Sequence, residues 1–289
     1  MKLIKLNKRY IIPNKAEKIN ILNNRCYLPI FKIRIIHLII TRFLMEVTKN
    51  KKYIELLYSE KFIQNGIRVM KKYLFASLEN QSCKNFTFIL LLGNKANITY
   101  IKDLLNLNTS FESNVIYQKD LRNYIRNTTK GFDVLITTRI DYDDIIYYDA
   151  VNDVRKAINI HKPLLLYGYK RGLVYYESDG KYYNFYSISN GGCIGLFASL
   201  IIFLNKVNDT YTIYDIGNHI LIRKIVLTNY KSFGIKNLNY DPAIFDSGDP
   251  KFIYVRQAYS LSYNYTHKIR KEIPLNNLNL SLFFNFPID

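Results

Sequence analysis

Three carboxylates crowd into four residues directly after an apolar, β-branched stretch of the chain. Residues 134–138 read Val-Leu-Ile-Thr-Thr, as a buried strand does, and Arg139, Asp141, Asp143 and Asp144 follow. Two carboxylates about 4 Å apart repel by roughly 4 kcal/mol at an effective dielectric constant of 20, so the cluster calls for a cation, a proton or exposure to water. Mg²⁺ and Mn²⁺ take oxygen ligands and commonly bind through one or two carboxylates plus substrate phosphates. The pattern predicts a metal-diphosphate site; the alternative is a solvated acidic turn that caps a following helix.

The elements that must position these carboxylates alternate between strands and helices. Five apolar residues recur at spacings of three and four, which places them on one helical face: Ile63, Ile67, Met70, Leu74 and Leu78. Strands are expected over residues 33–41, 86–92, 114–117 and 134–138, with further helices over 98–107 and 120–128. Alternating strands and helices imply an α/β fold with a mainly parallel, doubly wound sheet. Ligands bind at the carboxyl ends of the strands in such sheets, where the three aspartates lie.

The second half of the chain has a different character. A helix is expected over residues 150–160, strands over 163–169, 172–176 and 182–188, and a second helix over the apolar run 194–204. Asp179-Gly180 is a hairpin signal. We therefore expect a mixed antiparallel lobe packed against the first sheet.

No linker rich in Pro, Gly or Ser separates the two halves. The expected organisation is a basic extension over residues 1–30 and a single domain over residues 31–289, whose halves are residues 31–148 and 149–289.

The charge of the chain favours anionic ligands. Its 289 residues hold 41 Lys and Arg against 23 Asp and Glu, a formal net charge of +18. A nucleic-acid partner would use such a charge, because Lys and Arg neutralise phosphates. The basic residues are spread along the chain, however, and the excess of Lys, Asn, Ile and Tyr is what an AT-rich coding sequence produces. A nucleic acid is therefore not the expected partner. The alternative functions are a basic nucleic-acid-binding protein or metal-dependent nuclease, and a non-catalytic interaction module.

Three features bear on the location of the protein. Apolar stretches such as residues 33–44 are interrupted by Arg34 and Arg42, so we expect no membrane span, which needs about 20 apolar residues. Residues 1–30 lack the continuous apolar core of a signal peptide. The 3 cysteines are too few and too scattered for a disulfide framework. Together these features predict a cytoplasmic protein.

Three segments carry motifs that agree in order and spacing: Thr41-Arg42-Phe43, Ser77-Leu78 with Gln81, and Thr-Arg-Ile-Asp-Tyr-Asp-Asp at residues 138–144. Together they resemble the putative rhamnosyltransferase family, a group of GT-A glycosyltransferases. Thr-Arg-Ile-Asp-Tyr-Asp-Asp at residues 138–144 resembles the extended D-x-D motif of that family. Residues 36–43, which end in Thr-Arg-Phe, are similar to its first strand. Residues 70–88, with Ser77-Leu78 and Gln81 before Phe-Thr-Phe, are similar to its passage from a helix to the second strand. The resemblance covers roughly residues 33–230 and implies a GT-A-like fold.

On the donor side, the resemblance implies a site for a nucleotide sugar, UDP-linked or dTDP-linked, in residues 31–148. It implies that Asp143 and Asp144 hold Mn²⁺ or Mg²⁺ and that Asp141 lies near the donor's ribose or the metal. Donor contacts are further expected from Thr41, Arg42 and Arg139, with the two arginines on the diphosphate. The alternative to a contact with the diphosphate is that either arginine pairs with a neighbouring aspartate.

On the acceptor side, residues 149–289 would receive a glycan or glycoprotein, and the expected reaction is an inverting transfer of a sugar such as rhamnose. An inverting enzyme needs a carboxylate that deprotonates the acceptor hydroxyl. We expect Asp215 in this role, with Glu177, Asp179 and Asp209 as alternatives. His219 is expected on the metal, since a helix that starts at Asp215 would place positions i and i+4 on one face; a surface or core role for His219 is the alternative.

Overall fold

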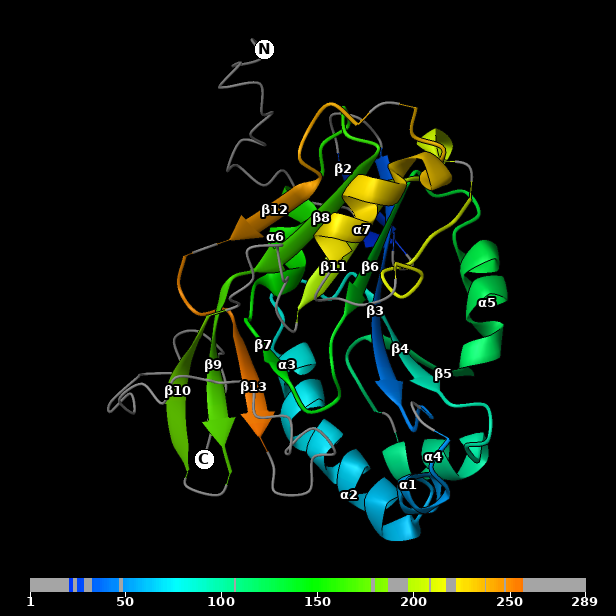
Figure 1. Cartoon of the computed structure of the whole chain (residues 1–289), viewed down its shortest axis with the longest axis vertical. Coiled ribbons are helices and arrows are strands. Elements are labelled where there is room, and N and C mark those ends of the chain that lie inside the picture. The colour runs from blue at the N-terminus through cyan, green and yellow to red at the C-terminus, as the bar shows by residue number, and fades with distance from the viewer. Residues whose placement is uncertain are drawn as a thin grey trace.

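The computed structural model describes residues 21–22, 25–28, 33–46, 49–106, 108–177, 180–186, 197–207, 209–216, 222–236, 238–246 and 248–256. These residues build two β-sheets (Figure 1): a nine-stranded sheet with helices on both faces, and a four-stranded sheet at its side. Most of the expected basic extension, residues 1–30, lies outside the described residues.

The large sheet has a parallel core. Strands β5 (Glu112–Tyr117), β4 (Thr87–Leu92), β3 (Ile33–Phe43) and β6 (Val134–Arg139) lie side by side in that order, and all three pairings between them are parallel. Two short strands, β1 (Ile21–Leu22) and β2 (Arg25–Leu28), extend the sheet, with β2 antiparallel to the start of β3. The predicted α/β fold class is confirmed.

Beyond β6 the sheet continues through one antiparallel strand. β11 (Ala198–Phe203) pairs antiparallel with both β6 and β8 (Leu164–Tyr169), and β12 (Ala243–Asp246) runs parallel to β8. The helix expected over residues 194–204 is therefore wrong where the structure describes that run. Every residue of β11 is buried, because both faces of the sheet are covered there. A short apolar run buried on all sides carries no alternation that distinguishes strand from helix.

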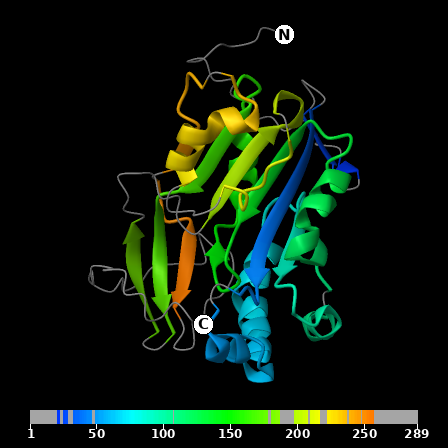
Figure 2. The same ribbon diagram turned by 45° about the vertical axis from the view of Figure 1, so that its right-hand side comes forward.

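Helices cover both faces of the large sheet (Figure 2). On one face α2 (Glu60–Met70), α3 (Ala76–Glu79), α4 (Ile98–Leu105) and α6 (Ala150–Lys156) bury the larger core cluster, and on the other lie α5 (Leu121–Thr128) and α7 (Ile222–Asn229). The remaining helical elements are α1 (Lys51–Leu57), a π-helical segment (Lys71–Phe75) and 3₁₀ turns at Gln118–Asp120, Leu204–Lys206 and Tyr230–Phe233. This arrangement confirms the doubly wound sheet.

The apolar periodicity over residues 63–78 predicts the packing of α2, the π-helical segment and α3. The Ser59 hydroxyl accepts a hydrogen bond from the backbone N–H of Phe62, which caps the start of α2. All five periodic residues are buried in the larger core cluster: Ile63, Ile67, Met70, Leu74 and Leu78. Val69 and Tyr73, four residues apart, lie on an adjoining helical face and pack against the small sheet.

The small sheet contains strands from distant parts of the chain. Its order is β10 (Lys181–Tyr186), β9 (Arg171–Tyr176), β13 (Phe252–Arg256) and β7 (Ile145–Ile146). The outer pairings are antiparallel and the central pairing of β9 with β13 is parallel. Gly180 has φ of 64°, which suits the hairpin turn predicted between β9 and β10. The predicted mixed antiparallel lobe is thus confirmed.

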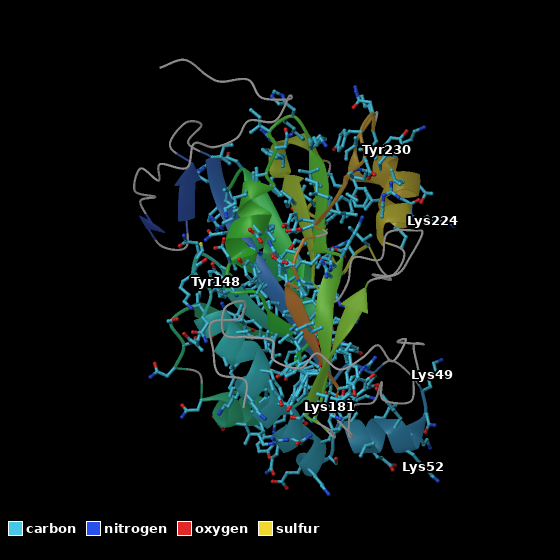
Figure 3. The ribbon with its side chains drawn as sticks, turned by 90° about the vertical axis from the view of Figure 1, so that its left-hand side faces the viewer. Lys49, Lys52, Tyr148, Lys181, Lys224 and Tyr230 are labelled. Carbon is cyan, nitrogen blue, oxygen red and sulfur yellow. The ribbon has the colours of Figure 1, made fainter. Side chains whose placement is uncertain are left out.

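The exposed lysines lie on separate parts of the molecule (Figure 3). Lys49 and Lys52 lie at the start of α1, Lys181 at the start of β10, and Lys224 on α7, and all four are exposed. This distribution agrees with a charge spread along the chain. Within the described ranges, no helix is both long and apolar enough to cross a membrane.

Candidate functional site

The three clustered aspartates lie on the loop that joins the two sheets. The loop leaves the carboxyl end of β6 and enters β7 at Ile145. Its first residue, Ile140, donates a backbone hydrogen bond of 3.3 Å to the carbonyl of Ile40, and Asp144 N–H donates one of 3.2 Å to the carbonyl of Asp141. These contacts fix a tight loop at the edge of the sheet where the sequence predicts it.

The inner two carboxylates are buried. The exposed fraction is 8% for Asp143 and 1% for Asp144. By contrast, 35% of the Asp141 side chain is exposed. A solvated acidic turn before a helix is therefore the wrong interpretation for Asp143 and Asp144, and the element that follows them is strand β7.

Asp144 is the side chain whose environment is most unusual. Both of its carboxylate oxygens are buried, and neither has a hydrogen-bond partner within the part of the chain that the structure describes. A buried carboxylate is normally paired or hydrogen-bonded, because burial without a partner costs a large part of its hydration energy. The two oxygens are thus available to a cation.

Burial and mutual repulsion raise the pKa of both inner aspartates. The pKa of Asp143 rises to about 7, first because burial penalises the charged form and then because of repulsion by Asp141. The pKa of Asp144 is raised well above its ordinary range by burial and then by Asp143. The Arg256 guanidinium lowers the pKa of each. A divalent cation would favour the charged forms in the same way as Arg256 and more strongly.

The donor atoms at the loop fit a hard divalent cation that shares its shell with a ligand. Among the described residues, no group of three or more His, Cys, Asp and Glu side chains is arranged to hold a metal ion alone. Mg²⁺-type ions bound with diphosphates commonly take only one or two carboxylates from the protein. Asp143 and Asp144 supply that number, and Asp144 supplies two oxygens with no other described partner.

The two arginines predicted to contact a diphosphate lie over one aromatic ring. The guanidinium carbons of Arg42 and Arg139 are 5.0 and 5.7 Å from the centre of the Tyr214 ring. The Tyr214 hydroxyl donates a hydrogen bond of 3.0 Å to the carbonyl of Ile40, which anchors the ring to β3. Arg139 also pairs with Asp141 at 3.3 Å, the alternative that its position in the sequence leaves open. The structure thus brings together Arg42, Arg139 and Asp141.

Thr41 lies on the opposite side of β3 from Arg42. Successive residues of a strand point to opposite faces. Thr41 is fully buried, and its hydroxyl has no hydrogen-bond partner among the described residues. The donor contact expected of Thr41 stays a prediction, and its position associates it with the core rather than with the two arginines.

The residue chosen as base, Asp215, lies in a turn and not at the start of a helix. Its Oδ2 accepts hydrogen bonds from the backbone and hydroxyl of Thr212 at 2.7 and 2.9 Å, and Oδ1 is 3.8 Å from Arg122. Residues 213–216 form a turn, so Asp215 does not start a helix and the helical spacing assumed for Asp215 and His219 is wrong at its first residue. The next helix among the described residues is α7, from Ile222. Asp209 pairs similarly with Arg126 of α5 at 3.6 Å. His219 and Asp179 lie outside the described residues.

Two side chains near the aspartates come from the small sheet. Arg256, at the end of β13, is 5% exposed and lies 3.8 Å above the centre of the Tyr254 ring. Glu177 follows β9, and both Arg256 and Glu177 act electrostatically on Asp143. Sequence reasoning did not select Arg256, because only the pairing of β13 with β7 brings it to the loop. The one available signal was an arginine that ends an apolar strand.

A family model matches most of this chain. Residues 33–230 match the model described as "Putative rhamnosyl transferase". This range includes the aspartate loop, both arginines over Tyr214, and Glu177, and it ends before β13 and Arg256. A comparison with curated proteins found no match.

Solved structures with low sequence identity align with most of the chain. A crystal structure of S. aureus TarS, residues 1–349, aligns with a TM-score of 0.39 and 10% identity, covering 76% of this chain and 60% of that one. A putative nucleotide-diphospho-sugar transferase from Desulfovibrio desulfuricans G20 aligns with a TM-score of 0.36 and 11% identity, covering 76% of this chain and 80% of that one. The inositol-1-phosphate CTP transferase from T. maritima aligns with a TM-score of 0.34 and 11% identity, covering 82% of this chain and 97% of that one.

Proposed function

The chain belongs to the putative rhamnosyl transferase family, and from that premise we propose that it is a metal-dependent glycosyltransferase. The proposed donor is a nucleotide sugar, with rhamnose linked to dTDP or UDP as the first candidate. The proposed acceptor is a hydroxyl group of a glycan or glycoprotein. Metal dependence, the sugar and the acceptor are each part of the proposal.

The observation that carries the proposal is the pair of buried Asp144 oxygens without a described partner. A carboxylate in that state gains most from a divalent cation, because a cation removes the cost of burying its charge. Asp143 is the second protein ligand in this proposal, and Asp141 lies at the more exposed side of the loop. Diphosphate oxygens would complete the shell of the ion.

Arg42 and Arg139 are the groups that we propose for the diphosphate of the donor. Two guanidinium groups over one ring repel each other, and an anion between or beside them relieves that repulsion. Guanidinium groups form charge-assisted and bidentate hydrogen bonds with phosphate oxygens. Arg139 pairs with Asp141 at 3.3 Å, and Arg42 adds a second guanidinium over the same ring.

The chemistry follows from this placement. In a single displacement, the acceptor oxygen bonds to the anomeric carbon while the bond from that carbon to the diphosphate breaks, and the configuration inverts. The arginines stabilise the negative charge that develops on the departing diphosphate. A divalent cation, when bound, supplies further stabilisation of that charge.

A transfer assay with the full chain tests the proposal. The purified protein is incubated with dTDP-rhamnose, UDP-glucose or other nucleotide sugars in Mn²⁺ or in excess EDTA, and release of the nucleoside diphosphate is measured. We expect release from at least one donor in Mn²⁺ and a loss of at least about 100-fold in EDTA or in the Asp144→Asn variant. Asp103→Asn, which changes an exposed aspartate of α4, is the matched control and should retain wild-type turnover.

Other outcomes would overturn the proposal in different ways. Equal turnover in EDTA and in Mn²⁺ would rule out metal dependence. Cleavage of DNA or RNA in Mg²⁺, lost in Asp144→Asn and without release from any nucleotide sugar, would show that the carboxylates serve a nuclease. Nucleotide-sugar binding without turnover with any acceptor or water would indicate an interaction module.

A further inference from the structure

Glu177 lies at the end of the small sheet that also carries the aspartate loop. It follows the last residue of β9, and its backbone N–H donates a hydrogen bond of 3.0 Å to the carbonyl of Arg256. β13 runs parallel to β9 and antiparallel to β7, with Ile253 opposite both Leu173 and Ile145. The ends of β9 and β13 and the start of β7 therefore meet at one edge, where Asp143 and Asp144 precede β7.

A buried tyrosine from the helical layer fixes the Glu177 carboxylate. The Tyr73 hydroxyl donates a hydrogen bond to Oε1 of Glu177, and Lys72 Nζ lies 4.0 Å from the same oxygen. Both contacts use Oε1, so the lone pairs of Oε2 remain available for a proton. Burial, followed by the nearby Glu177 carboxylate, raises the pKa of Tyr73 strongly, so this hydroxyl remains a donor at neutral pH.

Tyr73 reaches Glu177 from a helical segment that packs against the small sheet. Tyr73 lies in the π-helical segment, and its side chain is 1% exposed among residues of the small sheet. Single π-helical turns within α-helices often occur at functional sites. Tyr73 in this segment packs against the small sheet and contacts the carboxylate of Glu177.

Glu177 differs from the other described carboxylates considered for acceptor activation. Asp215 accepts two hydrogen bonds within its own turn and faces Arg122, and Asp209 faces Arg126, so both are linked to α5. Glu177 retains 27% exposure of its side chain and acts on Asp143 through space. It is thus close to the proposed donor site and accessible to a second substrate.

From this geometry we infer that Glu177 is the base that deprotonates the acceptor hydroxyl and that Tyr73 is its positioning residue. The inference rests on the proposed glycosyltransferase function. The acceptor O–H bond breaks as the oxygen bonds to the anomeric carbon; the proton passes to the Glu177 carboxylate, and the electron pair of the broken glycosyl bond leaves with the diphosphate.

Two variants and a charged nucleophile test the inference. Azide is already an anion, so it can attack the donor sugar without a base. We expect Glu177→Gln to lower kcat for the acceptor by about 10²–10⁴-fold, with donor affinity within about twofold of wild type and glycosyl azide formed at the wild-type rate. Tyr73→Phe should lower the acceptor kcat less, with the same azide rate. Glu55→Gln, at an exposed position on α1, is the matched control.

The results also separate this inference from the proposed function. Acceptor turnover by Glu177→Gln within about twofold of wild type would overturn the role of Glu177. A parallel loss of acceptor and azide reactions would assign Glu177 to structure or donor binding instead. If Glu177→Gln does not fold, Glu177→Asp keeps the charge and moves it back by one methylene; wild-type acceptor turnover there would likewise contradict a positioned base. Absence of any transfer by the wild-type protein would instead refute the proposed function.

Discussion

Lys251 Nζ lies 2.8 Å from Asp153 Oδ2, so a cation that directly precedes β13 pairs with a carboxylate of helix α6. The same nitrogen is 2.9 Å from Asp246 at the end of β12. The backbone carbonyl of Lys251 accepts a hydrogen bond from Tyr147 N–H. One residue therefore joins the small sheet, the edge of the large sheet and a helix, which sets the position of β13 and hence of Arg256.

Replacement of this lysine should destabilise the protein. The Lys251 and Asp153 side chains are 18% and 14% exposed, so Lys251→Met removes the cation shared by two largely buried carboxylates, Asp153 and Asp246. Asp153 then keeps the longer pair, of 3.7 Å, with the exposed Lys156. We expect the free energy of unfolding to fall by about 2–4 kcal/mol in urea titrations. Lys95→Met breaks a pair of similar length whose lysine is 66% exposed, and it should cost less than about 1 kcal/mol. Equal losses in the two variants would contradict this account.

Binding of a nucleoside diphosphate should depend on a divalent cation. The reason is that Asp143 and Asp144 offer a diphosphate no positive charge by themselves, and in their charged forms they repel it. At about 100 times its dissociation constant, UDP or dTDP with Mn²⁺ should raise the free energy of unfolding by roughly 2.7 kcal/mol. Calorimetry should find that EDTA or Asp143→Asn removes most of this gain. The same affinity in EDTA would show that the carboxylates do not bind the ligand through a cation.

Loss of an arginine over Tyr214 should weaken diphosphate binding without unfolding the protein. Arg42→Gln removes a charge that lies over the ring, and hydrogen bonds to charged groups contribute about 1.5–3 kcal/mol, or roughly 10–150-fold in affinity. Arg126→Gln is the matched control, because Arg126 lies on α5 and pairs with Asp209. Isothermal titration with UDP and Mn²⁺ measures both variants. An unchanged affinity in Arg42→Gln would remove this residue from the site.

The folded protein should lose stability in mild acid because of one buried histidine, His37. The pKa of His37 is held well below its ordinary value, first by burial and then by the charge of Arg155. The unfolded chain therefore binds a proton near pH 6.5 that the folded protein does not, and stability falls as the pH declines below that value, by up to about 1.4 kcal/mol per unit. Above pH 6.5 this contribution is constant.

The pH experiment compares wild type with His37→Leu by urea unfolding at pH 5.5 and pH 8. The variant loses the 2.7 Å contact between His37 Nε2 and the Thr138 hydroxyl, so it should be less stable at pH 8. The difference between the two proteins should shrink at pH 5.5. A difference that is the same at both values would show that His37 does not titrate between the folded and unfolded states.

Local patterns in the sequence predict the first half of the fold well. The strand before the aspartates and the helical face over residues 63–78 follow from periodicity and β-branched composition, and both are confirmed. The apolar run that forms β11 was predicted to be a helix. A strand buried on both faces has no alternation of apolar and polar residues that would distinguish it from a buried helix.

The site itself was predictable only as far as it is local. The three aspartates and Arg139 lie within six residues, so their proximity follows from the chain. The burial of Asp144 depends on both sheets around the loop. Arg256 reaches the loop through the pairing of β13 with β7, and Tyr73 reaches Glu177 because its helix packs against the small sheet; neither relationship leaves a pattern in a single sequence.

The position of β11 also dictates an order of events during synthesis. β11 separates β6 from β8 in the sheet, yet it is made after both, and its contact with β6 spans 61 residues between Thr138 and Ser199. Until Phe203 has left the ribosome, one edge of β6 in the nascent chain is unpaired, and β8 lacks the strand that joins it to β6. Unpaired apolar edges are templates for pairing between chains. A slow stretch of translation before β11 would therefore prolong the interval in which two nascent copies can associate through β6.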